Sequence, residues 1–282
     1  MKGEQIQQHF EQQIVSLKTI AGGVNATIYK IDLMDGQSII AKASSQQDAM
    51  LHIEGKMLQY LANNSDLPVP DMLHSEPQLL IMRYINNHGR VTPSVEEDAA
   101  YHVATLHNIT VEHFGLPFDT LIGGLHQPNT EDDSWIDFFR EQRLLYMAQV
   151  AYEARQMPLK LRHRIEQFAT ALDNLLIEPE QPSLIHGDMW GGNVLVLDGK
   201  IAGFIDPAIY YAHPEIELAF STLFNTFGQR FFDVYTSLRP LEPEFFSVRR
   251  DIYNLYPLLV HVRLFGGGYV SQVDRTLKRF GY

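Results

Sequence analysis

Hydrophobic and polar residues alternate in the first third of the chain, in short runs that glycine, proline and aspartate separate. Alternation with a period of two is typical of β-strands that bury one face. These runs lie at residues 14–21, 26–33, 38–43, 72–74 and 78–85. Asp35-Gly36 is a strong hairpin signal between the second and third runs. From residue 47 to residue 61 the apolar positions recur at helical spacing, so a helix is predicted there.

Helical spacing dominates the rest of the chain. The predicted helices cover residues 95–109, 135–153, 159–176, 214–227, 243–265 and 270–280. Loop and hairpin sequence at 183–206 interrupts them. The pattern predicts an α+β fold with a small antiparallel β-rich lobe at 1–85 and a larger, mainly helical lobe at 86–282. This is the two-lobed architecture of protein kinases.

Composition excludes several classes of protein. The 282-residue chain has no cysteine, which rules out disulfides, thiolate nucleophiles and cysteine-based zinc sites. A formal net charge of −12 disfavours nucleic acid and anionic lipid as partners and favours a cationic one. No apolar run is long enough to cross a membrane, and the polar N-terminus lacks the apolar stretch of a secretion signal. We therefore expect a cytoplasmic protein.

The loop and hairpin sequence at 183–206 contains the residues that most clearly indicate a catalytic site. His186-Gly-Asp-Met-Trp-Gly-Gly-Asn193 is followed by a hairpin sequence that ends in Ile205-Asp-Pro207. Phosphoryl transfer to a hydroxyl requires one carboxylate to orient and deprotonate the acceptor, which we assign to Asp188. It also requires oxygen ligands for the Mg²⁺ that bridges the phosphates, which we assign to Asn193 and Asp206. The hairpin between these two returns the chain on itself, as two ligands of one ion require.

Each of these residues has an ordinary alternative. Asp188 and Asn193 are residue types common in turns, and Asp206 precedes a proline turn. These roles are plausible for one residue at a time, but the spacing of all three together favours the catalytic interpretation.

The first lobe holds candidates for nucleotide binding. Lys42 lies in an otherwise apolar strand, and Glu54 follows in the next helix, which is how kinases pair a lysine that holds the nucleotide phosphates. Gly22 and Gly23 form either a simple hairpin turn or a phosphate cover. At the end of the lobe, the backbone of Arg83-Tyr84-Ile85 is placed to bind adenine. The 1–85 lobe would then cover ATP, and the 86–282 lobe would carry the catalytic loop, the metal and the acceptor site.

Several motifs together resemble the fructosamine (ketosamine) kinase family, a branch of the aminoglycoside-phosphotransferase-like kinases. The resemblance rests on H-G-D-x-W-x-G-N at 186–193 and on D-P-A-x-Y-Y-x-H-x-E from Asp206. Further matches are Gln127-Pro-Asn129, Trp135 to Leu144, and Tyr253 to Tyr269. The resemblance implies an ATP- and Mg²⁺-dependent kinase that phosphorylates a sugar hydroxyl of a fructosamine or ribulosamine, which promotes deglycation of the amine.

Two positions depart from the pattern of the family. Glu217 stands where the resemblance implies an aspartate that braces the catalytic loop, and Arg263 stands where an asparagine is common. Three alternatives stay open: another small-molecule kinase of this fold, acting on an aminoglycoside, choline or a sugar; an inactive nucleotide-binding scaffold; and a helical binding protein. The scaffold would be expected to lose Lys42, Asp188, Asn193 or Asp206, and the helical protein leaves their spacing unexplained.

Overall fold

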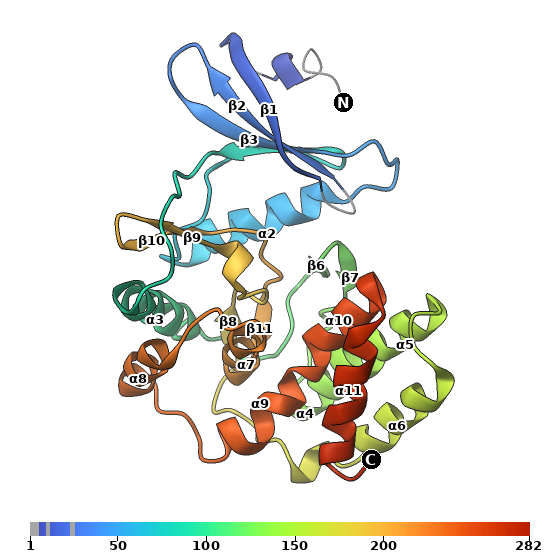
Figure 1. The fold of residues 1–282 in the computed structure, drawn as a ribbon. Coiled ribbons are helices and arrows are strands. Elements are labelled where there is room, and N and C mark those ends of the chain that lie inside the picture. The colour runs from blue at the N-terminus through green and yellow to red at the C-terminus, as the bar shows by residue number, and fades with distance from the viewer. Residues whose placement is uncertain (1–5, 10–11, 23–25) are drawn as a thin grey trace. The chain divides into compact units, whose positions relative to one another are not determined.

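The computed structural model describes residues 6–9, 12–22 and 26–282, and the chain divides into two compact units. The first unit contains the described residues up to Val95 together with Asn193–Pro207, and the second contains Glu96–Gly192 and Ala208–Tyr282 (Figure 1). An antiparallel sheet forms the first unit and helices dominate the second, so the predicted α+β class is confirmed. The lobe boundary after Ile85 stays a prediction.

The first unit is built on a sheet with the strand order β1-β2-β3-β5-β4, in which all neighbours are antiparallel. Its elements are β1 (Ile14–Gly22), β2 (Thr27–Leu33), β3 (Ser38–Ala43), α2 (Leu51–Asn64), β4 (Met72–Glu76), β5 (Leu79–Arg83), β9 (Val194–Leu197) and β10 (Lys200–Phe204). The predicted strands are therefore confirmed. The predicted helix at 47–61 forms as α2, which begins and ends a few residues later.

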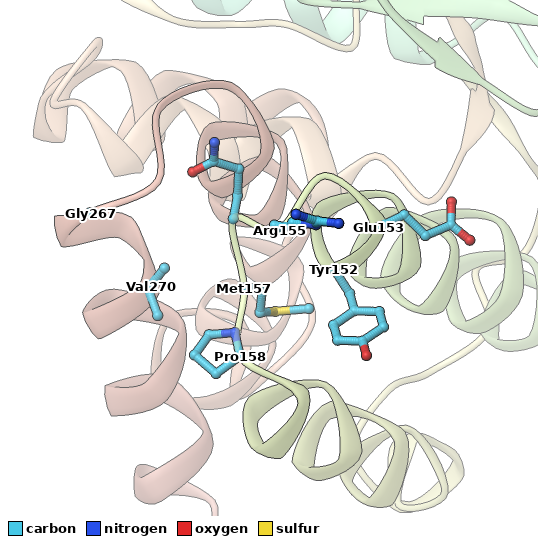
Figure 2. Close-up of a pocket in the computed structure, with 8 residues that line it drawn as sticks. Tyr152, Glu153, Arg155, Met157, Pro158, Gly267 and Val270 are labelled. Carbon is cyan, nitrogen blue, oxygen red and sulfur yellow. The ribbon is translucent and has the colours of Figure 1, made fainter.

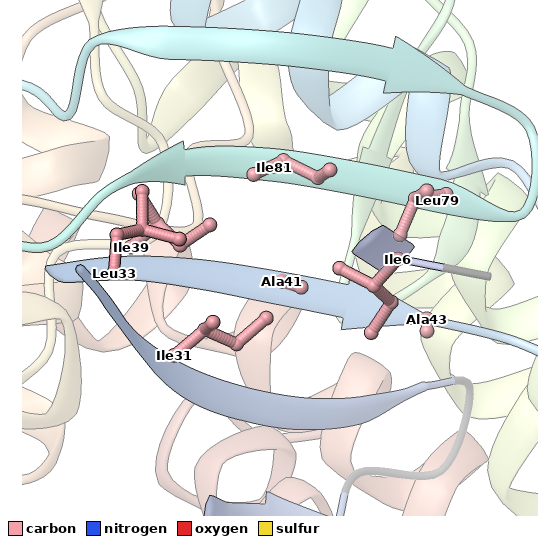
Figure 3. Packing of buried hydrophobic residues seen from close by; sticks show 8 residues of the cluster. All are labelled: Ile6, Ile31, Leu33, Ile39, Ala41, Ala43, Leu79 and Ile81. Carbon is pink, nitrogen blue, oxygen red and sulfur yellow. The ribbon is translucent and has the colours of Figure 1, made fainter. Parts of the chain in front are cut away.

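An apolar cluster lies on each face of this sheet. On one face Ile39 and Ala41 of β3 join Ile31 of β2 and Ile81 of β5 in an apolar cluster (Figure 3). On the opposite face Leu80 and Met82 of β5 pack against Leu51 and Leu58 of α2. Because successive side chains of a strand alternate between faces, the residues of β3 next to Ala41 point toward α2.

Helices form most of the second unit. They are α3 (Pro93–His107), which begins at the boundary, α4 (Trp135–Phe139), α5 (Tyr146–Glu153), α6 (Leu159–Ala169), α7 (Glu215–Leu223), α8 (Gln229–Leu238), α9 (Arg250–Tyr253), α10 (Leu255–Phe265) and α11 (Gly268–Arg279). Two π-helical turns, η1 (Arg140–Leu145) and η4 (Phe245–Arg249), join α4 to α5 and precede α9. Short 3₁₀ turns lie at η2 (Leu172–Asn174) and η3 (Gly191–Asn193).

The predicted helices differ from the observed ones mainly at their ends. The helix predicted at 159–176 ends at Ala169, and the one at 214–227 ends at Leu223, just before Asn225 adopts a left-handed φ of 54°. Helix α8 was not predicted. Its first turn is held by Glu96 of α3, whose carboxylate accepts hydrogen bonds from the backbone N–H groups of Gly228 (2.9 Å) and Phe231 (3.3 Å).

Two pairs of three-residue strands were also not predicted. They are β6 (Thr120–Ile122) with β7 (Leu125–Gln127), and β8 (Ser183–Ile185) with β11 (Tyr210–Ala212). The second pair aligns Ile185 with Tyr210, so the chain that leaves β8 runs beside the chain that enters β11. In the described part of the chain, no helix is both long and apolar enough to cross a membrane.

Candidate active site

The buried Lys42 is the centre of an ionic cluster in the first unit. Its Nζ lies 2.6 Å from Glu54 Oε1 and 2.5 Å from Asp206 Oδ1. The sequence placed Lys42 and Glu54 together, and the β9–β10 hairpin brings Asp206 to them from a distant part of the chain. The structure therefore joins three of the predicted site residues in one network.

The alternation of β3 explains this cluster. Lys42 lies next to Ala41 and so points toward α2, the helix that carries Glu54. Burial by itself lowers the pKa of the ammonium, but the attraction of Glu54 and Asp206 outweighs burial and the net pKa is raised. Lys42 therefore stays protonated at neutral pH, as a group that binds phosphate must.

Asn193 and Asp206 stand at the two ends of the β9–β10 hairpin. The Ile205 N–H donates to the Asn193 carbonyl at 3.1 Å, and Asn193 Nδ2 approaches the Asp206 carbonyl at 3.5 Å. Asp206 itself has a left-handed φ of 54° immediately before Pro207. Two residues that carry an amide oxygen and a carboxylate are thus neighbours at the ends of the hairpin, and these types of oxygen donor fit Mg²⁺ when phosphate oxygens and water complete its shell.

Asp188 lies in the second unit, on the loop that follows β8. Its N–H donates to His186 Nδ1 at 3.3 Å, and its carbonyl accepts from the Trp190 N–H at 3.0 Å. The buried His186 thus shapes its own loop, and its carbonyl accepts a 2.8 Å hydrogen bond from Ala208 N–H.

Gly187 is required by the geometry of this loop. It has a φ of +83°, and a Cβ atom added to it would lie 2.0 Å from the carbonyl oxygen of Ala208. Any other residue would therefore be strained by its own backbone and would collide with the chain that leads into β11.

Glu217 braces the loop that carries Asp188, the proposed catalytic loop, although the resemblance implied an aspartate at this position. Its Oε1 accepts the Gly187 N–H at 2.7 Å, and its Oε2 lies 2.9 Å from His107 Nε2. The other ring nitrogen of His107 lies 2.7 Å from the hydroxyl of Tyr235. The longer side chain therefore reaches the loop, and a histidine from α3 fixes its second oxygen.

The remaining nucleotide candidates are only partly described. Gly22 ends β1 opposite Thr27, while Gly23 lies outside the described residues. The N–H groups of Arg83 and Tyr84 donate to Asp71 and Ser38 within the sheet. An adenine contact at 83–85 is therefore restricted to their carbonyl oxygens and to the chain from Ile85 onward, because those two donors are already used.

A buried polar network that the sequence did not assign supports the catalytic loop. Gln127 Nε2 donates to the carbonyl of Ala208 (3.0 Å) and to Thr120 (2.7 Å), and Tyr256 donates its hydroxyl to Gln127 Oε1 (2.7 Å). Ala208 is the residue against which Gly187 packs, so Gln127 fixes one wall of the loop. The Gln127-Pro-Asn129 match pointed to this region, but no local pattern indicated the tertiary contacts.

The fully buried Arg143 belongs to the same region. Its guanidinium donates to the Pro128 carbonyl and to Asn129 Oδ1, both at 2.6 Å. It lies 3.8 Å from the ring centre of Tyr210 and 4.6 Å from that of Phe138. The acceptors of the Arg143 guanidinium are thus a carbonyl and an amide oxygen and not carboxylates. The faces of the two aromatic rings add to the stabilisation of its positive charge.

A separate cavity of about 650 Å³ lies between the α5–α6 connection and the start of α11 (Figure 2). Tyr152, Gln156, Met157 and Gly267 are among its lining residues. None of the residues around it belongs to the catalytic loop, so we do not assign the acceptor site to it.

Comparison with known proteins decides the family. A sequence model described as fructosamine kinase matches residues 2–280 of the chain. The chain belongs to the fructosamine kinase family. The resemblance that the motifs predicted is thus confirmed over nearly the whole length.

Relatives within the fructosamine kinase family align along most of the chain. A probable ketoamine kinase of Vibrio parahaemolyticus is 32% identical over 281 residues, which cover 96% of this chain and 94% of the relative. The chloroplastic protein-ribulosamine 3-kinase of Arabidopsis thaliana is 30% identical over 272 residues, which cover 92% of this chain and 80% of the relative.

Solved structures confirm the two-lobed, protein-kinase-like fold. A crystal structure from Thermobifida fusca, assigned as a fructosamine-3-kinase, superposes with a TM-score of 0.85 at 29% identity and covers 98% of both chains. An aminoglycoside phosphotransferase in complex with AMP-PNP and hygromycin B superposes with a TM-score of 0.69 at 17% identity, covering 98% of this chain and 97% of that one. The latter likeness concerns the fold alone.

Proposed function

We propose that this fructosamine kinase family member transfers the γ-phosphoryl group of ATP to a sugar hydroxyl of a ketosamine. The observation that carries the proposal is the ionic cluster in which the buried Lys42 contacts both Glu54 and Asp206. An ammonium that stays charged between two carboxylates is suited to nucleotide phosphates, and the residues 186–193 supply the acceptor side. Fructosamines and ribulosamines are the acceptors that the names of its relatives indicate.

Each residue has a distinct task in this proposal. Lys42 binds the α- and β-phosphates, and Glu54 keeps its ammonium oriented. Asp188 orients the acceptor hydroxyl and accepts its proton late in the transfer, as the loose transition state collapses. The product carries a phosphate next to the ketoamine carbonyl, which promotes elimination and release of the amine, so the proposed physiological outcome is deglycation.

Asn193 and Asp206 would hold Mg²⁺, which when bound neutralises the charge on the transferring phosphoryl group. Lys42 already contacts Asp206, so this carboxylate links the phosphate-binding cation to the metal-binding pair. We further propose that Gly22, Gly23 and the chain around Ile85 contact the nucleotide. The cytoplasmic location expected from the sequence stays a prediction.

The test is ATP consumption by the purified protein with Mg²⁺ and a panel of acceptors. The panel contains a fructosyl-amino acid, a ribulosyl-amino acid, an aminoglycoside, choline and free fructose. The Asp188→Asn variant serves as the blank, because an amide cannot accept the proton; its turnover should fall by orders of magnitude while ATP affinity, measured by calorimetry, stays close to that of the wild type.

The outcomes separate the alternatives. Turnover confined to the two ketosamines is the expected result. Turnover of choline or an aminoglycoside alone would keep the phosphotransfer and discard the ketosamine acceptor. Binding of ATP without any turnover would favour an inactive scaffold, and wild-type turnover by Asp188→Asn would remove that residue from its role.

A further inference from the structure

A row of aromatic side chains extends from the catalytic loop across the second unit. We call it the aromatic strip; its members are Trp190, Phe224, His261, Phe265 and Tyr269. The ring centres of Trp190 and Phe224 are 6.3 Å apart, those of Phe224 and His261 are 5.0 Å apart, and His261 lies 4.9 Å from Tyr269. Phe265 flanks His261 at 5.7 Å. Neighbouring rings are thus in contact along the whole strip.

Much of the strip is accessible to solvent. Trp190 is 42% exposed and Phe265 is 58% exposed, whereas Trp135, the other tryptophan, is fully buried. The remaining members of the strip are half-buried. A row of contacting aromatic rings that is partly exposed in this way is a candidate binding surface.

Trp190 is held in place rather than left free. A Cβ atom added to Gly192 would lie 2.4 Å from the indole ring, so the ring lies directly on the Gly192 backbone. The edge contact with Phe224 fixes it from the second side. A ring held this way loses little side-chain entropy when a ligand binds to it, which favours affinity.

His261 adds one polar group to the strip. Its Nδ1 lies 2.7 Å from the Pro257 carbonyl, which can only accept, so Nδ1 carries the proton. Burial lowers the pKa of the imidazole, and the ring is therefore neutral at pH 7. Its Nε2 is then an acceptor for an N–H group.

The chemistry of a ketosamine places its amine close to this strip. The nitrogen is on C1, the carbonyl is C2, and the hydroxyl next to the carbonyl is on C3, so few bonds separate the amine from the acceptor hydroxyl. Trp190 follows Asp188 by two positions, and its N–H donates to the Asp188 carbonyl at 3.0 Å. We therefore expect a substituent on the nitrogen of a ketosamine bound at Asp188 to begin near Trp190.

We infer that the aromatic strip binds the amine side of the ketosamine: the alkylammonium nitrogen and the apolar or aromatic group attached to it. An ammonium is attracted to the face of an indole, and the alkyl or aryl group gains by covering the exposed rings. The net charge of −12 also favours a cationic acceptor. A sugar ring fits the strip less well, because its hydroxyls need several polar partners. The inference rests on the proposed function and adds to it the part of the substrate that sets specificity.

The test compares two ketosamines that differ only in the amine. One is 1-amino-1-deoxyfructose, which has no substituent on nitrogen, and the other is the fructosyl derivative of phenethylamine. The quantity measured is the ratio of kcat/KM for the substituted substrate to that for the unsubstituted one. The wild type is expected to prefer the phenethylamine derivative, and the double variant Phe265→Ala/Tyr269→Ala to lose about tenfold of that preference, in line with the strength of one or two aromatic contacts.

A ratio between two substrates separates binding from folding, because a general loss of structure lowers both values alike. Tyr101→Ala is the matched control, since it removes an exposed aromatic residue of α3 that lies outside the strip. An unchanged ratio in the double variant, or an equal loss on both substrates, would overturn the inference. A loss confined to a glycated protein assayed in parallel would also overturn it, because the strip would then be a docking surface for proteins. Failure of the proposed function looks different: the wild type would turn over neither ketosamine.

Discussion

Lys42 keeps its charge in a place from which water is largely excluded, so its partners determine both its chemistry and the stability around it. Only 9% of its side chain is exposed, and that of Glu54 is 15% exposed. Removing one member of a buried ion pair leaves the other charge desolvated and unpaired, whereas removing both is far less costly. Stability and activity should therefore respond differently to single and double substitutions here.

The Lys42→Met variant is expected to lose about 3 kcal/mol of unfolding free energy and to lose ATP binding. The double variant Lys42→Met/Glu54→Leu should regain most of the stability but none of the ATP affinity. Urea denaturation and calorimetric titration with Mg-ATP measure the two effects. Recovery of ATP affinity in the double variant would show that Lys42 acts only through the fold.

Glu217 provides a second comparison at the level of single residues. Glu217→Ala removes the acceptor of the Gly187 N–H and is expected to lower kcat about 100-fold, because the loop that carries Asp188 loses its position. The KM for ATP should change little, since the residues proposed to bind ATP lie in the other unit. Glu217→Gln retains an oxygen for the Gly187 N–H and should recover most of kcat. Equal losses for the two variants would contradict a positioning role.

The elements that hold the catalytic loop are short and were mostly hidden from sequence patterns. Strands β8 and β11 have three residues each, so neither shows a period of two, and their pairing depends on chain segments far apart. The π-helical turn η1 presents Arg143 toward Asn129 and Pro128. Support for the loop therefore comes from tertiary contacts between elements.

Arg143 should be intolerant even of lysine. A lysine keeps the charge but cannot donate in a planar fork to two acceptors while lying flat on the Tyr210 ring. Arg143→Lys is expected to cost about 3 kcal/mol of unfolding free energy in urea denaturation, because buried acceptors lose their donors. Arg275→Lys, on the exposed face of α11, should have an effect close to zero. If both substitutions changed the unfolding free energy equally little, the positive charge of Arg143 alone, and not the shape of its guanidinium, would account for its contribution to stability.

At the scale of the whole molecule, buried histidines link stability to pH. Burial, reinforced by the nearby Arg249, lowers the pKa of His213 to about 3. The unfolded chain therefore binds a proton at this position below pH 6.5, while the folded protein does not. The unfolding free energy therefore has no penalty from His213 above pH 6.5, and it falls as the pH drops from 6.5 toward 3. The pKa of His107 is also lowered by burial and acts in the same direction.

In the His213→Asn variant, unfolding at acidic pH should take up one proton fewer than in the wild type. The amide oxygen takes over from Nδ1 as acceptor of the Glu215 N–H, a 3.2 Å contact in the native protein. Between pH 6 and 4 the unfolding free energy should then fall less steeply, by about 1.4 kcal/mol per pH unit at most. Urea denaturation at several pH values measures the slope. His163→Asn, on an exposed position of α6, should leave the slope unchanged.

The sequence predicted the class of fold and the Lys42–Glu54 pair because both depend on local patterns; the contact of Lys42 with Asp206, 164 residues away, was not predicted. Lys42 and Glu54 lie in neighbouring elements, and a strand followed by a helix fixes their relation. The contacts of Glu217 were beyond reach, because its partner His107 lies 110 residues away in the sequence. His107 is held in turn by Tyr235, from a helix that was not predicted. The apolar stripe of that helix, with Phe231, Phe232 and Tyr235, was nevertheless present in the sequence.

The two tryptophans of the chain differ in solvent exposure, so intrinsic fluorescence can report on one of them separately. Trp135 is sealed in the core, while the half-open indole of Trp190 rests on the Gly192 backbone beside Asp188. In a Trp135→Phe protein all indole emission would come from the catalytic loop. If the proposed acceptor site is correct, its occupation could then be followed by fluorescence, without a label and without turnover.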